Sequence, residues 1–201
     1  MNFDDTFYSD SIYHIWSHAN GTENLFREVK NYNFFKDKYW KFIGPIAHTF
    51  GYCLLPNHFH LLIKTKSLKE MNHNIKNISF EESNVNQHMR QKFSNLLNSY
   101  TKSYNRLYKR KGSLFIPRFK RKLIDTEEYF TKIILYIHSN PVHHHLVKSI
   151  DDWAYSSWYA YAYDKEDIVY KEEVLKWFGG KNFLVKAHQD ININYENFYT
   201  T

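Results

Sequence analysis

Two histidines separated by one residue stand in an apolar stretch, HFHLLIK at 58–64. In a strand, successive side chains alternate between the two faces, so His58 and His60 would point the same way and Phe59 the other way. Two imidazoles on one face can bind one divalent cation, whereas two buried imidazoles without partners would be costly. The alternative is chance, because the chain has 12 histidines. The apolar neighbours favour a metal site.

Tyr136 is a second candidate for chemistry, as a nucleophile. It stands in a stretch whose apolar stripe runs through Ile133 and Ile137 at helical spacing. On that helix Tyr136 falls on the flank of the stripe, and Asn140 lies beside it one turn later. A side chain on the flank is ordered by packing and still reaches a ligand. With 17 tyrosines in the chain, the alternative is an ordinary packing role.

Positive charge is concentrated in residues 102–122, which contain nine basic residues and no acidic one. The same segment contains Tyr104, Tyr108, Phe115 and Phe119. Cations interleaved with aromatic rings suit a polyanion whose bases can stack, which indicates single-stranded nucleic acid. The alternative is a solvated helix face followed by a strand whose aromatics belong to the core.

The whole chain has 201 residues and a formal net charge of +6, and 43% of its residues are hydrophobic and 19% aromatic. This composition excludes intrinsic disorder and predicts one compact domain. We place the functional core at residues 1–165 and a peripheral C-terminal extension at residues 166–201. The single cysteine, Cys53, excludes an internal disulfide framework and a cysteine-rich zinc module.

The sequence also bears on location. The N-terminal residues are acidic and lack the basic start and apolar stretch of a signal peptide, and no apolar run approaches the roughly 18 residues of a membrane span. We therefore expect a cytoplasmic protein without a membrane partner.

Hydrophobic periodicity predicts strands and helices that alternate along the chain. Strands are expected at 11–17, 47–55, 58–64 and 113–124, and helices at about 23–42, at 86–109 and from Asp125 to a stop at Asn140-Pro141. Asp125 and Glu128 have the spacing of a capping box, and Pro117 indicates an irregular or edge strand. The turn at Pro56-Asn57 predicts a hairpin. Together these elements favour an α+β fold, with helices packed on a mainly antiparallel sheet.

Four separated stretches resemble a known family in the order in which they occur. They are GYCLLPNHFHLLIK at 51–64, RKGSLFIPRFKRKLI at 110–124, LYIHSNPVHHHLV at 135–147 and DDWAYSSWYAY at 151–161. The sequence resembles the single-tyrosine HUH transposases, the small insertion-sequence and REP-associated tyrosine transposases. The resemblance extends over residues 11–161. It implies a ferredoxin-like or RRM-like sandwich with the histidine pair on a central strand.

The resemblance also implies roles for single residues. His58 and His60 match the pair that binds a divalent metal, Tyr136 matches the nucleophile, and Asn140 stands where the family has a further polar ligand. We expect Mg²⁺ or Mn²⁺, because the abundance of Mg²⁺ in cells can outweigh the stronger binding of other ions by imidazole. The implied activity is metal-dependent cleavage and strand transfer of single-stranded or hairpin DNA through a 5′-phosphotyrosine.

The basic segment would then contact the DNA phosphates. The protein would be associated with the nucleoid in the cytoplasm. The expected DNA-binding residues are Lys109, Arg110, Lys111, Arg118, Lys120, Arg121 and Lys122. The family includes monomers and homodimers that exchange the tyrosine helix, so a homodimer is an open expectation. Two alternatives stand beside this interpretation. One is a domesticated, non-catalytic DNA hairpin-binding protein, and the other is a phosphodiesterase in which a metal-bound pair of histidines works with water.

Overall fold

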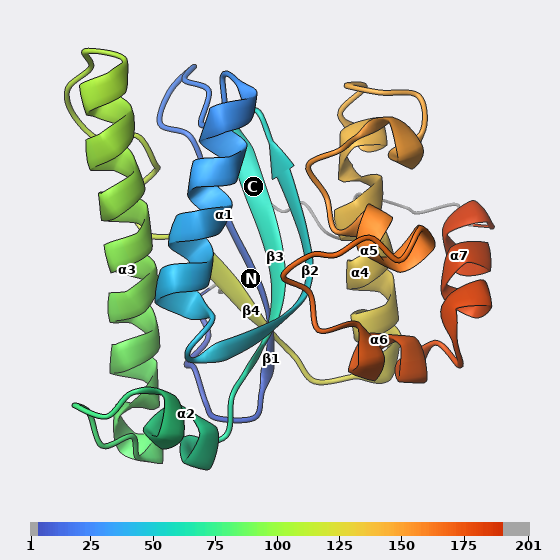
Figure 1. Ribbon diagram of the computed structural model, residues 1–201, viewed down its shortest axis with the longest axis horizontal. Helices are drawn as coiled ribbons and strands as arrows, with labels where there is room; N and C mark the ends of the chain where they lie inside the picture. Colours follow the sequence, from blue (N-terminus) through green and yellow to red (C-terminus); the bar gives the residue numbers. More distant parts are fainter. Residues whose placement is uncertain (1–3, 191–201) are drawn as a thin grey trace.

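The computed structural model describes residues 4–190. A four-stranded sheet lies at its centre, with helices on both faces (Figure 1). The strands are β1 (Ile12–His18), β2 (Ala47–Leu55), β3 (His58–Thr65) and β4 (Lys120–Ile124), in the order β2-β3-β1-β4. All neighbouring pairs are antiparallel. The α+β class and the antiparallel sheet predicted from the sequence are confirmed.

Strands β2 and β3 form the predicted hairpin, and β1 pairs with β3 on its other side. The register sets Trp16 opposite His60 and His18 opposite His58. On the far side of β1, Trp16 is opposite Lys120. Because side chains of directly paired residues share one face of a sheet, these residues form one polar surface on three adjacent strands.

Two helices cover the other face of the sheet, α1 (Val29–Ile43) and α3 (Glu82–Leu107). The short helix α2 (Leu68–Asn74) follows β3. The core on this side contains Phe59, Leu61 and Ile63. These β3 residues point away from the polar surface, on which His58 and His60 lie. β3 is therefore buried on both faces, and its near-continuous apolar sequence agrees with that.

Helix α4 (Glu127–His143) covers the polar surface and builds a second core. Its residues Ile133, Ile134 and Ile137 are completely buried. Each such side chain contributes about 1.5–3 kcal/mol to folding. Gly51 on β2 lets this helix come close, because a Cβ at Gly51 would lie 3.1 Å from Cδ1 of Ile134. The position of α4 over the sheet is therefore tightly fixed.

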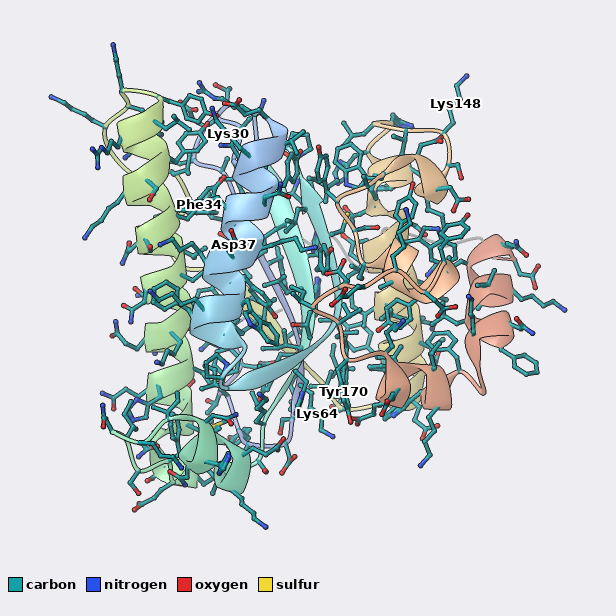
Figure 2. The ribbon with its side chains drawn as sticks, viewed as in Figure 1. Lys30, Phe34, Asp37, Lys64, Lys148 and Tyr170 are labelled. Carbon is teal, nitrogen blue, oxygen red and sulfur yellow. The ribbon has the colours of Figure 1, made fainter. Side chains whose placement is uncertain are left out.

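The C-terminal segment packs on the outer side of α4 and along the edge of β2 (Figure 1). It contains a 3₁₀ turn (Ile150–Asp152), α5 (Trp158–Ala162), α6 (Lys171–Trp177) and α7 (Lys181–Gln189). Tyr170 donates its backbone N–H to the carbonyl of Thr49 over 2.7 Å. Nearby, the ammonium of Lys64 lies 2.8 Å from the carboxylate of Glu173, and Lys64 and Tyr170 lie close to each other in Figure 2. The domain boundary at residue 165 stays a prediction. Within residues 4–190, no helix is long and apolar enough to cross a membrane.

Several predicted boundaries are wrong. Helix α1 begins at Val29 and not near residue 23, because Glu28 and Asn31 form a capping box there. Helix α4 begins after Thr126, whose side chain accepts the Tyr129 N–H, so Asp125 is not the cap. The third difference lies in 113–124, where only β4 is a strand.

The predicted end of α4 is also wrong, because the helix continues through Pro141 to His143. A proline at this point removes only one hydrogen bond of the last turn. The carbonyls of Asn140 and Pro141 are satisfied by the N–H groups of His144 and Leu146. Asn140 therefore keeps helical geometry, one turn after Tyr136.

Candidate active site and nucleic-acid interface

The histidine pair lies at the centre of the surface that α4 covers. His58 and His60 are 2% and 1% exposed, and their ring centroids are 5.2 Å apart. Phe59 between them packs on the opposite side of the sheet, in the core formed with α1 and α3. The apolar stretch is thus a strand buried on both faces, as its sequence predicts, and it carries both imidazoles toward α4.

Tyr136 lies against this pair. Its ring meets that of His60 edge to face, with 5.4 Å between centroids, and meets that of His14 at 6.2 Å. The side chain of Tyr136 is completely buried. Sequence reasoning assigned it to the flank of a helix, but the sheet and the C-terminal segment enclose α4 on two sides. All of these side chains belong to one chain, so no exchange of helices is needed to bring them together.

Asn140 brings an amide oxygen to the same place. Its Nδ2 donates to the carbonyl of Tyr136 over 3.5 Å, which turns Oδ1 toward Nε2 of His58 at 3.4 Å. The ring of His58 is oriented from its other side, where Nδ1 donates to Oδ1 of Asn57 over 2.8 Å. Nε2 of His58 therefore has its lone pair toward the Asn140 oxygen. Two acceptors that face each other in this way suit a cation between them.

His14 is a member of this site that sequence reasoning did not single out. Its Nε2 lies 2.9 Å from Nδ1 of His60. The other nitrogen of His60, Nε2, is buried and has no hydrogen-bond partner within residues 4–190. The sequence places His14 in the same strand as His18, but the contact of His14 with His60 arises only because β1 pairs with β3.

Burial keeps these imidazoles neutral. Loss of water lowers the pKa of His14 to about 3, and loss of water together with the neighbouring His18 and His144 lowers the pKa of His58 to about 3. The same loss of water, with His14 beside it, holds the pKa of His60 well below its usual value. Neutral imidazole is the form that coordinates metals.

Two further histidines lie beside His58. His18 on β1 stacks on its ring and His144 after α4 meets it edge to face, each with centroids 4.7 Å apart. Burial lowers the pKa of both. His144 is exposed, and its ring borders the site.

A buried chain of hydrogen bonds anchors the tyrosine helix to the sheet and to the C-terminal segment. Ser157 Oγ accepts the N–H of Tyr52 over 2.9 Å and lies 2.7 Å from Nε2 of His138. His138 Nδ1 is 2.8 Å from Nε2 of His188, whose Nδ1 donates to the carbonyl of Leu184. Burial lowers the pKa of His188 to about 4 and holds that of His138 well below its usual value. Each group in this chain is satisfied only while α4 and α7 stay in place.

The predicted DNA-binding residues separate into groups. Lys120 and Lys122 project from β4 on the surface that carries the histidine pair, and Lys122 lies 3.4 Å from the carboxylate of Asp5. Lys109 and Lys111 are exposed beyond the end of α3. Arg118 is exposed on the segment before β4, where it adopts a positive φ of 64°.

Arg110 and Arg121 are also engaged within the protein. Arg110 donates to Glu23 over 3.0 Å. Arg121 is 3% exposed, and its guanidinium forms an ion pair with Asp4. A buried guanidinium that already has its partners is not available to a phosphate, so Arg121 acts in the structure of this edge.

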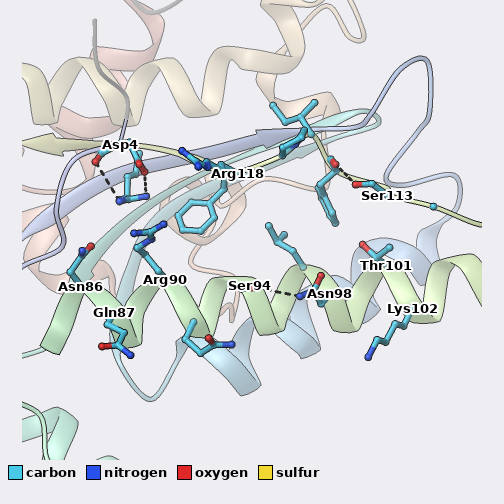
Figure 3. A pocket seen from close by; sticks show the side chains of 18 residues that line it. Asp4, Asn86, Gln87, Arg90, Ser94, Asn98, Thr101, Lys102, Ser113 and Arg118 are labelled. Carbon is cyan, nitrogen blue, oxygen red and sulfur yellow. Dashed lines mark hydrogen bonds and ion pairs between the residues drawn. The ribbon is translucent and has the colours of Figure 1, made fainter.

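A groove of about 830 Å³ lies between α3 and residues 112–121, on the side of the sheet away from α4 (Figure 3). Arg90 of α3 and Arg118 of the opposite wall line it, together with amide and hydroxyl side chains. These amides and hydroxyls come from Asn86, Gln87, Gln91, Ser94, Asn98 and Thr101. The wall reaches the histidine surface as well, because Ile116 donates its N–H to the carbonyl of His18.

The donors around the histidine pair fit a divalent cation. Within the described residues, no three His, Cys, Asp or Glu side chains converge as metal ligands. The set is instead two imidazoles and one amide oxygen, from His58, His60 and Asn140. The buried Nε2 of His60, which has no hydrogen-bond partner within residues 4–190, and the 3.4 Å approach of Asn140 Oδ1 to Nε2 of His58 are compatible with such a set.

No protein-family model and no curated protein matches this sequence. Among solved structures, the chain is similar to a REP-associated tyrosine transposase bound to a REP hairpin. The two share 17% sequence identity with a TM-score of 0.59, over 85% of this chain and 91% of that one. The chain has the fold of that transposase. At this identity, what the two proteins share is the course of the backbone, and the chemistry of the site rests on the residues described above.

Proposed function

We propose that this chain is a single-tyrosine transposase of the HUH type, which cleaves single-stranded DNA next to a hairpin and rejoins it. The observation that carries this proposal is the contact of Tyr136 with His60 across the interface of α4 and β3, at 5.4 Å between ring centroids. Asn140 faces His58 one turn later. A nucleophile and a set of metal ligands thus meet at one place. The fold that the chain shares with a transposase agrees with this function.

His58, His60 and Asn140 would hold Mg²⁺ or Mn²⁺ through two ring nitrogens and one amide oxygen. When bound, the ion neutralises charge on the scissile phosphate and orients it. The chain's own residues prepare this state. Asn57 fixes the ring of His58, and burial keeps both imidazoles neutral.

The covalent step exchanges one phosphodiester for another. The phenolic oxygen of Tyr136 forms a bond to phosphorus while the bond from phosphorus to the 3′-oxygen breaks. The phenolic proton is lost and the leaving 3′-oxygen gains one. The products are a 5′-phosphotyrosine and a free 3′-hydroxyl. Attack by the 3′-hydroxyl of a second strand reverses the step and releases Tyr136, so rejoining needs no nucleotide cofactor.

The DNA would follow the positive side chains of the groove and of the histidine surface. Arg90 and Arg118 line the groove, and Lys120 and Lys122 stand on the surface of the histidine pair. The segment before β4 borders both places. Phosphate contacts of this kind fix the position of a strand without reading its sequence.

The test is a cleavage assay on 5′-tailed, single-stranded hairpin DNA. Wild type should form a protein–DNA adduct that survives a denaturing gel with Mg²⁺ or Mn²⁺ and is absent with a chelator. Tyr136→Phe should form none. Tyr129→Phe is the matched control, because Tyr129 lies two turns earlier on the same helix, and it should form the adduct normally. Cleavage that survives Tyr136→Phe would replace the proposal with hydrolysis by water.

The complete burial of Tyr136 favours a second candidate, a hairpin-binding protein without catalysis. In the described conformation DNA reaches Tyr136 only after the side chains around it move. Hairpin binding without adduct or cleavage, over a broad panel of hairpins and both metals, would establish this second function.

A further inference from the structure

The contact between His14 and His60 joins two adjacent strands through their ring nitrogens. His14 lies opposite Leu62 and therefore diagonal to His60 on the same face. Nε2 of His14 is 2.9 Å from Nδ1 of His60, and the ring planes differ by 17°. The side chains are 4% and 1% exposed. The register of the sheet and the burial of both rings hold this contact in place.

One proton is shared between these two nitrogens. Both rings are neutral, because a charged imidazole would lose its hydration here. A neutral imidazole has one N–H and one lone pair. Either His14 donates to His60 or His60 donates to His14. The two arrangements differ at the other nitrogen of His60, Nε2, which carries a proton in the first and a lone pair in the second.

The surroundings favour the second arrangement. If His14 donated, the proton on Nε2 of His60 would be buried without an acceptor within residues 4–190. A buried donor without an acceptor is costly. If His60 donates, His14 carries its own proton on Nδ1, which is not among the buried polar atoms without a partner. The second arrangement thus leaves no buried donor unsatisfied in this pair.

We propose that His14 is a positioning residue, which accepts a hydrogen bond from Nδ1 of His60 and so keeps the lone pair of His60 Nε2 available to a divalent cation. This inference rests on the proposed function, because it concerns the same histidine pair. His14 acts through His60. The hydrogen bond at the second nitrogen of a coordinating histidine fixes the tautomer and the ring orientation and raises the basicity of the first.

The tautomer can be measured directly. The full chain is labelled with ¹⁵N-histidine and stripped of metal with a chelator, and long-range ¹H–¹⁵N correlation spectra report which nitrogen carries the proton. His60→Gln identifies the signals of His60. Wild type should carry the proton on Nδ1. His14→Gln, whose amide oxygen can accept the same hydrogen bond, should keep this form, and His14→Phe should lose the preference. A proton on Nε2 of His60 in wild type overturns the proposal.

Binding of Mn²⁺ without DNA gives a second measurement. His14→Phe should weaken Mn²⁺ binding about 10- to 100-fold, as expected for loss of a supporting hydrogen bond, while His14→Gln should stay within about threefold of wild type. His73→Phe, at an exposed site on α2, is the matched control and should not change the affinity. Unchanged affinity in folded His14→Phe overturns the proposal. If His14→Phe does not fold, the tautomer of wild type decides.

These measurements are separate from the test of the proposed function, because the tautomer is read without metal or DNA. A wild type that forms no adduct, but whose His60 tautomer depends on His14, would contradict the transposase and leave the role of His14 intact. A wild type that forms the adduct, but whose His60 carries its proton on Nε2, would support the transposase and overturn the role of His14.

Discussion

Oδ1 of Asn140 lies 3.4 Å from Nε2 of His58, across the interface between the tyrosine helix and the central hairpin. Both atoms are acceptors once Nδ1 of His58 donates to Asn57 and Nδ2 of Asn140 donates to the backbone of Tyr136. The helix therefore carries the proposed nucleophile, Tyr136, and the proposed metal ligand, Asn140, on consecutive turns. Any rotation of the helix would move both together.

Asn140→Leu tests the amide as a ligand. Leucine has nearly the same shape but no oxygen, so Mn²⁺ affinity should fall by at least about 10-fold while the fold is kept. Isothermal titration calorimetry on the metal-free chain measures the affinity. Asn98→Leu, an exposed amide on α3, serves as the control. Wild-type affinity in Asn140→Leu would remove Asn140 from the ligand set.

Stability of the metal-free chain should fall as the pH drops below 6.5. The pKa of His14 and of His58 is about 3 and that of His188 about 4 in the folded chain, against the ordinary histidine value of 6.5. Between these pKa values the unfolded chain binds more protons than the folded chain, so the free energy of unfolding rises with pH. The contribution of each histidine reaches its full size above pH 6.5. From pH 6.5 to 5 the loss should be about 2 kcal/mol for each such histidine.

Urea unfolding at a series of pH values, with a chelator present, measures this loss. In His188→Gln the free energy of unfolding should depend less on pH, because the contribution of one histidine is removed. A flat profile between pH 5 and 6.5 would contradict the burial of these neutral rings.

Ser157→Ala should destabilise the anchor of the tyrosine helix. The N–H of Tyr52 and the ring of His138 would lose their shared partner in a buried place. The expected loss is about 1–3 kcal/mol in the free energy of unfolding. Denaturant unfolding at pH 7 measures it. An unchanged midpoint would mean that these two groups find other partners.

Gly51→Val should push against the tyrosine helix. The added side chain would meet Ile134, which already lies 3.1 Å from the position of a Cβ. Such overpacking costs about 1–3 kcal/mol. Ile134→Val should restore part of this loss in the double variant, because the two sites are in contact. Simple additivity of the two changes would show that they do not interact.

Arg118→Gln and Arg90→Gln should weaken binding of hairpin DNA and make it less dependent on salt. Each lost phosphate contact lowers the slope of log affinity against log salt by about 1. Fluorescence anisotropy from 50 to 200 mM salt, the range in which such contacts are usually compared, measures the slope. Lys41→Gln, exposed on α1 outside the groove, is the control. Unchanged slopes would exclude the groove as the DNA track.

Patterns of local origin were predicted well. The hairpin β2–β3 follows from its two largely apolar stretches and the turn at Pro56-Asn57 between them, and the predicted ends of β2 agree with the structure. The start of α1 was wrong because residues 23–28 form a loop whose Leu25 and Phe26 are buried. Tyr100 donates its hydroxyl to the carbonyl of Leu25 from another helix. Apolar residues in the sequence thus indicate which side chains are buried, but long-range contacts determine whether the backbone there is a helix or a loop.

The site was predicted only in part for the same reason. His58 and His60 are neighbours in one strand, so their common face follows from the strand alone. The contact of His14 with His60 spans 46 positions and depends on the register between β1 and β3. The burial of Tyr136 depends on the segment after α4, which has weak periodicity. The roles of Tyr136, Asn140 and the basic residues stay predictions.

The site is distributed over the chain in an order that matters during synthesis. β1 and β3 are complete before residue 66, whereas Tyr136 and Asn140 follow some seventy positions later. Until α4 has left the ribosome, one face of the sheet, with Phe50 and Leu62, is open to water. Docking of α4 therefore removes a surface prone to aggregation and brings Tyr136 to the histidine pair in a single late event.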